Sequence, residues 1–185
     1  MRLLMFFVIA GILISCNDEV VIKPAAWLRL EYPRPVYQEI NISCPFSFEK
    51  NTAAVISQKQ KCALNIRYPN MKATVYLTYQ VVKNNNLEAL LYDAQKLAYN
   101  HDIKALSIPE QPFSNPKENV YGMFYKINGD AASQSHFYVT DSVNHFLTGS
   151  LYFESKPNFD SIYPAVVFLR EDIRRMMETM RWKEE

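Results

Sequence analysis

The chain has 185 residues and a formal net charge of +1 at pH 7, from 20 basic and 19 acidic residues. This balanced charge offers no electrostatic attraction to nucleic acid, so nucleic-acid binding is not expected. The glycines, Gly11, Gly122, Gly129 and Gly149, are scattered, which excludes a glycine-rich phosphate-binding loop.

The N-terminus has the parts of a lipoprotein signal peptide. Arg2 supplies a short positive region, residues 3–13 form an uninterrupted apolar run, and small Ser15 precedes Cys16. The run is too short for a membrane-spanning helix, which needs about 20 residues. Residues 13–16 resemble the bacterial lipobox, in which the thiol receives a diacylglyceryl group and the signal is cut before the cysteine. The alternatives are an ordinary signal peptide with a cysteine there by chance, or a buried N-terminal helix.

The lipobox divides the chain into three predicted parts. Residues 1–15 are the signal peptide, residues 16–24 a lipidated tether, and residues 25–185 a single domain. One acyl chain binds a membrane only marginally, at about 0.8 kcal/mol per buried CH₂, so two or three chains, such as palmitate, make a stable anchor. We therefore expect an envelope protein held to a membrane through Cys16, either facing the periplasm or in the outer membrane.

Cys44 and Cys62 remain as an even pair once Cys16 is assigned to the lipid. Each lies at the edge of a strand-like run, and a hairpin would bring them together as a disulfide, which can persist in an exported protein. In the chain-entropy model a loop of this length contributes about 3 kcal/mol. The alternatives are two free thiols or one catalytic cysteine, but neither cysteine has a histidine near it in sequence to activate it.

The first half of the domain is predicted to be mainly strand. Pro24, Pro33 and Pro35 exclude a helix in residues 20–42, which should be extended. Alternating apolar residues predict half-buried strands around residues 46–48 and 64–68, and residues 73–82 form the clearest strand.

A helix is predicted next, followed by a loop. Asn85 and Glu88 resemble a capping box at the start of the helix. An apolar stripe at helical spacing, which should pack on a sheet, is formed by Leu87, Leu90, Leu91, Ala94, Leu97 and Ala98. Residues 106–119 contain Pro109, Pro112 and Pro116 and are expected to form a loop.

Two hairpins are predicted in the second half. Residues 120–127 and 134–140 are strands joined by a tight turn at Asn128-Gly129. In the next hairpin, pairing Asp141 with His145 gives a three-residue loop with Asn144 in the left-handed position. Gly149 then lies opposite Phe137, and one face collects Phe137, Val139, Leu147, Leu151 and Phe153. A four-residue loop would scatter these residues over both faces, so burial favours the first register.

The C-terminal helix is predicted over residues 162–181, with Pro164 tolerated in its first turn. Its buried stripe is Val166, Leu169, Ile173, Met176 and Met180, with Met177 outside it. Strands in runs with two amphipathic helices indicate an α+β fold with a mainly antiparallel sheet.

Few residues suggest chemistry. His101 ends a helix, where a cation complements the helix dipole. The preferred register places His136 and His145 on opposite faces, so they cannot share a metal, and Asp141 is the expected partner of His145. Turn chemistry explains Asp141 and Ser142 better than a hydrolase triad does. The absence of a C-x-x-C motif gives no support for zinc. We therefore predict no catalytic, cofactor-binding or metal-binding residue.

Two groups of side chains could contact a partner. One is an adaptable methionine cluster, although helical spacing favours core: Met176, Met177 and Met180. The other is an aromatic patch for a protein partner on the strands: Tyr76, Tyr121, Tyr125 and Tyr138.

Several segments, taken in order, carry a resemblance to a known family. They are Pro33-Arg34-Pro35 through Tyr37-Gln38, residues 44–49, residues 72–79, residues 128–153, residues 158–162, and Trp182-Lys183. In this order they resemble the GldD family of gliding-motility lipoproteins of Bacteroidota, over nearly all of the mature chain. Ala25-Ala26-Trp27 departs from the small-plus-aromatic, often basic, pattern of that family.

The resemblance implies an envelope lipoprotein needed for surface gliding, a process coupled to type IX secretion. It implies no active site, and a fold similar to the PsbP/Mog1 α/β sandwich. The leading hypothesis is a non-catalytic accessory or assembly factor that contacts other gliding or secretion proteins. One alternative is a lipid-anchored module with a deep apolar pocket for a small hydrophobic or peptide ligand. Another is an envelope hydrolase, which needs His145 or His101 in a cleft beside a nucleophile.

Overall fold

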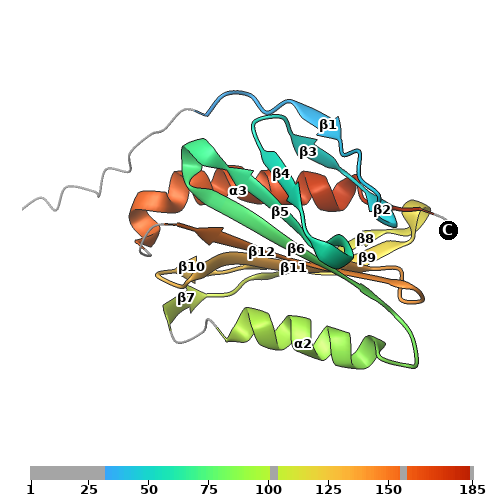
Figure 1. Cartoon of the computed structure of the whole chain (residues 1–185). Helices are drawn as coiled ribbons and strands as arrows, with labels where there is room; N and C mark the ends of the chain where they lie inside the picture. Colours follow the sequence, from blue (N-terminus) through green and yellow to red (C-terminus); the bar gives the residue numbers. More distant parts are fainter. Residues whose placement is uncertain (1–31, 101–103, 155–157, 184–185) are drawn as a thin grey trace, which may run out of the picture.

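The computed structural model describes residues 32–100, 104–154 and 158–183. Its centre is a seven-stranded antiparallel sheet in the order β4-β5-β6-β12-β11-β9-β8 (Figure 1). Helix α3 (Phe159–Glu178) lies on one face and helix α2 (Leu87–Tyr99) on the other. This arrangement confirms the predicted α+β fold, with a mainly antiparallel sheet and two amphipathic helices.

The strands follow the alternation of apolar and polar residues in the sequence. The central sheet contains β4 (Val55–Gln58), β5 (Leu64–Tyr68), β6 (Ala73–Val81), β8 (Glu110–Asn115), β9 (Val120–Lys126), β11 (Ser133–Thr140) and β12 (His145–Phe153). Two-stranded ribbons pair β1 (Tyr37–Glu39) with β3 (Glu49–Asn51), β2 (Phe46–Ser47) with β13 (Arg181–Trp182), and β7 (Ala105–Ser107) with β10 (Asn128–Gly129). The 3-10 turns are η1 (Gln60–Cys62), η2 (Pro69–Met71) and η4 (Pro116–Glu118).

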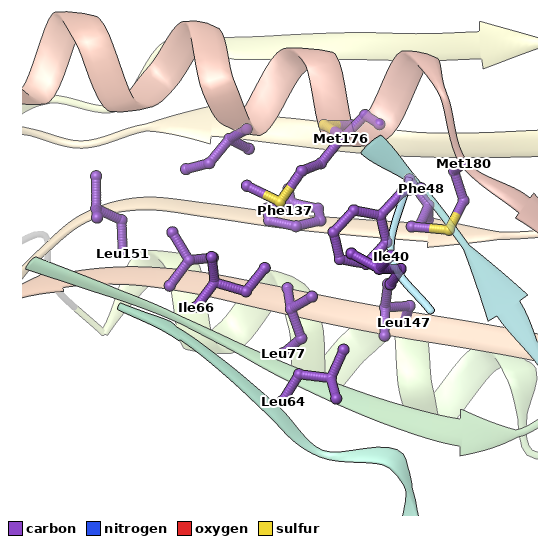
Figure 2. Packing of buried hydrophobic residues seen from close by; sticks show 14 of the residues in the cluster. Ile40, Phe48, Leu64, Ile66, Leu77, Phe137, Leu147, Leu151, Met176 and Met180 are labelled. Carbon is purple, nitrogen blue, oxygen red and sulfur yellow. The ribbon is translucent and has the colours of Figure 1, made fainter. Parts of the chain in front are cut away.

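The main core lies between the sheet and α3. Because successive side chains of a strand point to opposite faces, alternate residues such as Phe137 and Leu147 point toward α3. There they meet the helix around Met176, while Ile40 and Phe48 enter from the N-terminal segments (Figure 2). Burying each such side chain stabilises the fold by about 1.5–3 kcal/mol.

The predicted stripe of α3 is buried, but Met177 contradicts its prediction. Met177 is only 1% exposed, because α3 packs against the β1–β3 ribbon as well as against the sheet. All of the methionine cluster is therefore core rather than contact surface: Met176, Met177 and Met180. The helix also begins earlier than predicted, since the Asn158 side chain caps it by accepting the Ser161 N–H.

Helix α2 covers a smaller apolar cluster around Phe146, formed by Leu90 and Ala94. Leu97 was predicted in this stripe but is 40% exposed, because α2 contacts the sheet along a narrower strip. The predicted capping box is wrong. Asn85 has a left-handed φ of 59°, and the Asn86 side chain bonds the backbone of Lys83 and Val81 instead of capping the helix. His101 lies outside the described residues.

The predicted register of the β11–β12 hairpin is confirmed. Phe137 pairs with Gly149, and Val139 pairs with Leu147. The left-handed residue is Ser142, with a φ of 66°, rather than Asn144. Asp141 accounts for this turn, because its Oδ1 accepts the backbone N–H groups of the next residues in the loop.

The prediction of a loop over residues 106–119 is wrong. These residues contain β8, which pairs with β9 at one edge of the sheet. Pro112 is tolerated there because an edge strand needs ladder hydrogen bonds on only one side. Asn128-Gly129 is likewise not a tight turn. It pairs with β7, and Gly129 has a φ of 117° that favours glycine.

A disulfide joins Cys44 to Cys62, whose Cα atoms lie 5.7 Å apart. It connects the segment before β2 to η1, at the end of β4. The bond therefore ties an N-terminal segment to the edge of the central sheet.

Candidate functional site

A cleft of about 600 Å³ opens at the end of the sheet where α3 finishes. Four segments that are far apart in sequence converge there: the end of β6, the η4 turn, the β11–β12 hairpin and β13. The residues that line the cleft are Tyr79, Val81, Lys117, Glu118, Asn119, Asp141, Asn144, His145, Trp182 and Lys183.

Three aromatic rings form one wall of the cleft. The His145 imidazole stacks on the Trp182 indole, with centroids 4.9 Å apart and planes 10° from parallel. His145 Nδ1 is 2.8 Å from the Tyr79 hydroxyl, and the Trp182 indole N–H donates to the Asn119 carbonyl at 3.1 Å. The hydrogen bonds hold the rings in place, so the wall is fixed. Asp141 was the expected partner of the His145 ring, but Tyr79 takes that position.

Asp141 instead holds the hairpin. Its Oδ1 accepts the backbone N–H groups of Val143, Asn144 and His145 at 2.8–2.9 Å. Burial raises the pKa of Asp141, but these hydrogen bonds outweigh it and hold the pKa below its usual value. The carboxylate is therefore charged at neutral pH. The role of its Oδ1 is to accept the backbone hydrogen bonds of the turn.

The charges around the cleft are balanced. Glu118 pairs with Arg181 at 3.7 Å, and the Lys183 ammonium donates to the Ile42 carbonyl at 3.0 Å. Lys117 is exposed and faces the same opening. The cleft thus combines an aromatic wall with both charge signs, and neither sign dominates.

His136 lies on the other face of the sheet, as predicted from the register. Its Nδ1 is 2.6 Å from the Ser150 hydroxyl of the paired strand. A serine–histidine contact invites a catalytic interpretation, but His136 is 3% exposed and Ser150 is 8% exposed. The pair is part of the packed sheet, and its burial keeps the hydroxyl from a substrate.

A buried carboxyl group, Asp172, was missed by sequence reasoning. It accepts hydrogen bonds from the Tyr37 hydroxyl at 2.7 Å and from the Asn51 amide at 2.9 Å. The buried Tyr68 hydroxyl faces the same carboxyl, although no hydrogen bond of ordinary geometry joins them. Burial raises the pKa of Asp172, while these hydrogen-bond donors act in the opposite direction. The cluster fastens the β1–β3 ribbon to α3.

A smaller pocket of about 270 Å³ lies beside this cluster. Residues 32–36 cross it as an extended strap, with the Tyr32 ring 4.8 Å from the Phe168 ring of α3. Its walls are mainly apolar, and Asn51 and Tyr68 contribute polar groups to its lining. Its apolar walls match part of the small-ligand hypothesis, but most of its lining comes from residues 32–36, the segment after β3 and η2 rather than from α3 and the central sheet.

Helix α2 divides the predicted tyrosine patch. It covers the part of the sheet that holds Tyr125, which is 3% exposed, and half-buried Tyr138. Tyr121 and Tyr76 remain exposed, and a hollow of about 300 Å³ lies beside Tyr76. The hollow, lined also by Arg67 and Glu154, is on the part of the face formed by β4, β5 and β6. We call it the β4–β6 face.

Within residues 32–100, 104–154 and 158–183, no group of three or more histidine, cysteine or acidic side chains could hold a metal ion. In the same part of the chain, no helix is both long and apolar enough to cross a membrane.

Comparison with known proteins gives one match. A family model described as gliding motility lipoprotein GldD matches residues 17–182. No curated protein and no solved structure matches the chain. Similarity to the PsbP/Mog1 sandwich therefore stays a prediction.

Proposed function

The chain belongs to the GldD family of gliding motility lipoproteins, and from this we propose that it is a non-catalytic accessory or assembly factor of the gliding and type IX secretion machinery. The observation that carries the proposal is the extent of the match, residues 17–182. A lipoprotein of this family is a membrane-anchored envelope protein. The role in the gliding and secretion machinery, the contacts with its other proteins and the membrane face on which the protein lies are parts of the proposal.

We propose that the anchor is the acylated thiol of Cys16, after removal of residues 1–15. Residues 16–24 then act as tether to a domain over residues 25–185. The nine residues at positions 16–24 can span at most about 32 Å when extended. The described part of the chain can thus reach partners well above the membrane surface while its acyl chains stay in the bilayer.

The hydrogen bonds of the candidate catalytic groups support a non-catalytic role. The His145 ring bonds a phenol rather than a serine or cysteine, and it stacks on Trp182. Asp141 Oδ1 caps the hairpin, and the His136–Ser150 pair is buried. Each of these groups has a structural partner that explains its position.

We propose the β4–β6 face as the surface that contacts another envelope protein. Tyr76 is 45% exposed there and packs edge-on against Tyr152, with ring centroids 5.8 Å apart. Arg67 and Glu154 beside the hollow can pair with charges of either sign. Aromatic side chains with charged neighbours are typical of binding hot spots.

A photocrosslinking amino acid at position 76 tests this surface in intact cells. We expect a discrete crosslink to a gliding or secretion protein. Position 92, on the exposed side of α2, is the matched control and should give no such product. Equal crosslinking from both positions would remove the β4–β6 face from the proposal.

Deletion of the gene tests the function itself. We expect loss of surface gliding and reduced export of type IX cargo, both restored by the wild-type gene. Normal gliding together with normal cargo export in the deletion strain would refute the proposed role.

The pocket beside Asp172 favours one second candidate, a lipid-anchored module for a small hydrophobic or peptide ligand. Its mainly apolar walls suit an aliphatic or aromatic group, and its volume of about 270 Å³, just below the usual range for ligand sites, admits only a small one. An Ala53→Trp substitution would fill the pocket from its exposed rim. Loss of binding of a fluorescent hydrophobic probe in this variant would support the candidate, and no saturable binding to the wild-type protein would exclude it.

A further inference from the structure

We propose that the cleft at the end of the sheet binds an uncharged oligosaccharide. The inference rests on the proposed function only in placing the protein in the cell envelope, where saccharide chains are abundant. It concerns the cleft formed by β6, η4, the β11–β12 hairpin and β13, not the β4–β6 face assigned to a protein partner.

The aromatic wall supplies the apolar part of such a site. Trp182 and His145 lie nearly parallel at 4.9 Å, and both line the cleft. A pyranose ring has a flat face of C–H groups that can pack on an aromatic surface, which removes apolar area from water. The hydrogen bond between Tyr79 and His145, and the one from the Trp182 indole N–H to the Asn119 carbonyl, fix the two rings before a ligand arrives, so little conformational entropy is lost on binding.

The polar lining suits hydroxyl groups, which both donate and accept hydrogen bonds. Asp141 Oδ1 is occupied by the hairpin, and the residues described supply no donor to its Oδ2, which can accept from a ligand. Exposed Asn119 and Asn144 offer amide donors and acceptors, and exposed Lys117 offers a donor. Donors and acceptors thus surround the same opening.

The charge and size of the cleft favour a neutral ligand. Lys117 and Lys183 lie beside Asp141 and Glu118, and Glu118 also pairs with Arg181, so the surplus is a single positive charge and the cleft attracts a polyanion such as nucleic acid only weakly. The volume of about 600 Å³ lies within the range of about 300–1,000 Å³ usual for ligand sites. Two envelope sources share the required chemistry: the N-acetylated glycan of a cell wall and an uncharged exopolysaccharide.

The two tryptophans permit a direct test on the full-length, detergent-solubilised lipoprotein. Trp27→Phe leaves Trp182 as the single tryptophan, so its fluorescence reports on the cleft. Chitotetraose represents the N-acetylated source and cellotetraose the other, with tetragalacturonate as the charged comparison. We expect a saturable change with at least one neutral tetrasaccharide, a micromolar to low-millimolar Kd by calorimetry, and weaker binding of tetragalacturonate.

Exposed residues give variants that should fold normally. Lys117→Ala and Asn144→Ala should each weaken saccharide binding about two- to tenfold, the effect of one lost hydrogen bond. Tyr92→Ala, on the exposed side of α2, is the matched control and should bind like the parent. Preference for chitotetraose would indicate a cell-wall glycan, and preference for cellotetraose an exopolysaccharide.

The assignment is overturned by any of three results. These are the absence of saturable binding of either neutral saccharide, unchanged affinity in both cleft variants, or tighter binding of tetragalacturonate or of a tetrapeptide. Gliding distinguishes this failure from failure of the proposed function. If the deletion strain cannot glide and the purified protein binds no saccharide, the saccharide site is refuted while the accessory role in gliding is retained.

Discussion

Asp172 shows how one residue can fasten two parts of the fold at an electrostatic cost. Its carboxyl is 2% exposed and accepts hydrogen bonds from Tyr37 and Asn51 of the β1–β3 ribbon. Burial still raises the pKa of Asp172, so the charged form is disfavoured in the folded protein. No sequence pattern predicts this burial, because a charged residue in an amphipathic helix is ordinarily assigned to the solvent side.

Asp172→Ala and Asp172→Asn separate the hydrogen bonds from the charge. The alanine variant leaves the Tyr37 hydroxyl and the Asn51 amide without their acceptor, and we expect it to lose about 1–3 kcal/mol of unfolding free energy. The asparagine variant keeps an acceptor without the charge and should lose less. Urea titrations measure both, and Glu171→Gln, an exposed neighbour, should stay within about 0.5 kcal/mol of the wild type.

The pH dependence of Asp172 has a definite sign. Its pKa is higher in the folded than in the unfolded protein, so the folded state binds more protons between the two values. Stability from this group is therefore present below the unfolded pKa of about 3.9 and is lost as pH rises through the folded pKa. The stability difference between wild type and Asp172→Asn should fall over that window. A difference that is flat or rises with pH would contradict the raised pKa.

Gly149 is required by close packing across the β11–β12 hairpin. A Cβ at this position would lie 2.1 Å from Phe137 Cε1 and 2.8 Å from Leu77 Cδ2. Both neighbours are packed in the core, so Gly149→Ala should destabilise the protein by about 1–3 kcal/mol through overpacking. Thermal unfolding in a double-mutant cycle checks the cause. The same substitution should cost less in a Phe137→Leu background, and equal costs in both backgrounds would rule out this clash.

At the scale of elements, the spacing of apolar residues and their expected burial predicted the structure better than the proline and glycine content of supposed turns did. The β11–β12 register and the α3 stripe follow from placing apolar residues on one buried face. Residues 106–119 were misread because prolines suggest a loop, whereas Pro112 lies in an edge strand that needs fewer backbone donors. The prediction of a two-residue turn at Asn128-Gly129 is wrong because Gly129 adopts its positive φ within a short ribbon paired with β7.

The disulfide is an element-scale prediction, because it ties the segment before β2 to η1. Closing the loop between Cys44 and Cys62 should stabilise the protein by about 3 kcal/mol through the entropy of the unfolded chain. Reductant should lower the melting temperature of the wild type and leave a Cys44→Ser/Cys62→Ser variant unchanged. Alkylation with mass spectrometry of protein from cells should find both thiols blocked. Free thiols at both positions would contradict the prediction.

At the scale of the whole molecule, sequence reasoning found only part of the cleft. His145 and Asp141 were placed together because they lie in one hairpin. Tyr79, Lys117 and Trp182 come from three other segments, and no local period or spacing signals their convergence. Local patterns describe which face of an element is buried, whereas a site built from four segments depends on tertiary packing. The nearest signal in the sequence was the C-terminal Trp182-Lys183 pair in the family resemblance.

In the proposed lipoprotein, attachment of the whole molecule to its membrane depends on modification of one residue, Cys16. At about 0.8 kcal/mol per buried CH₂, loss of all acyl chains from Cys16 removes the stable anchor, and the tether offers no compensating basic patch. Cys16→Ala should therefore abolish incorporation of labelled palmitate. The variant should either keep its signal peptide or be released when membranes are washed. Ser15→Gly keeps a small residue before the cysteine and should label normally. Palmitate label that persists in Cys16→Ala, or an unmodified thiol at position 16 in protein from wild-type cells, would show that the membrane attachment has another origin.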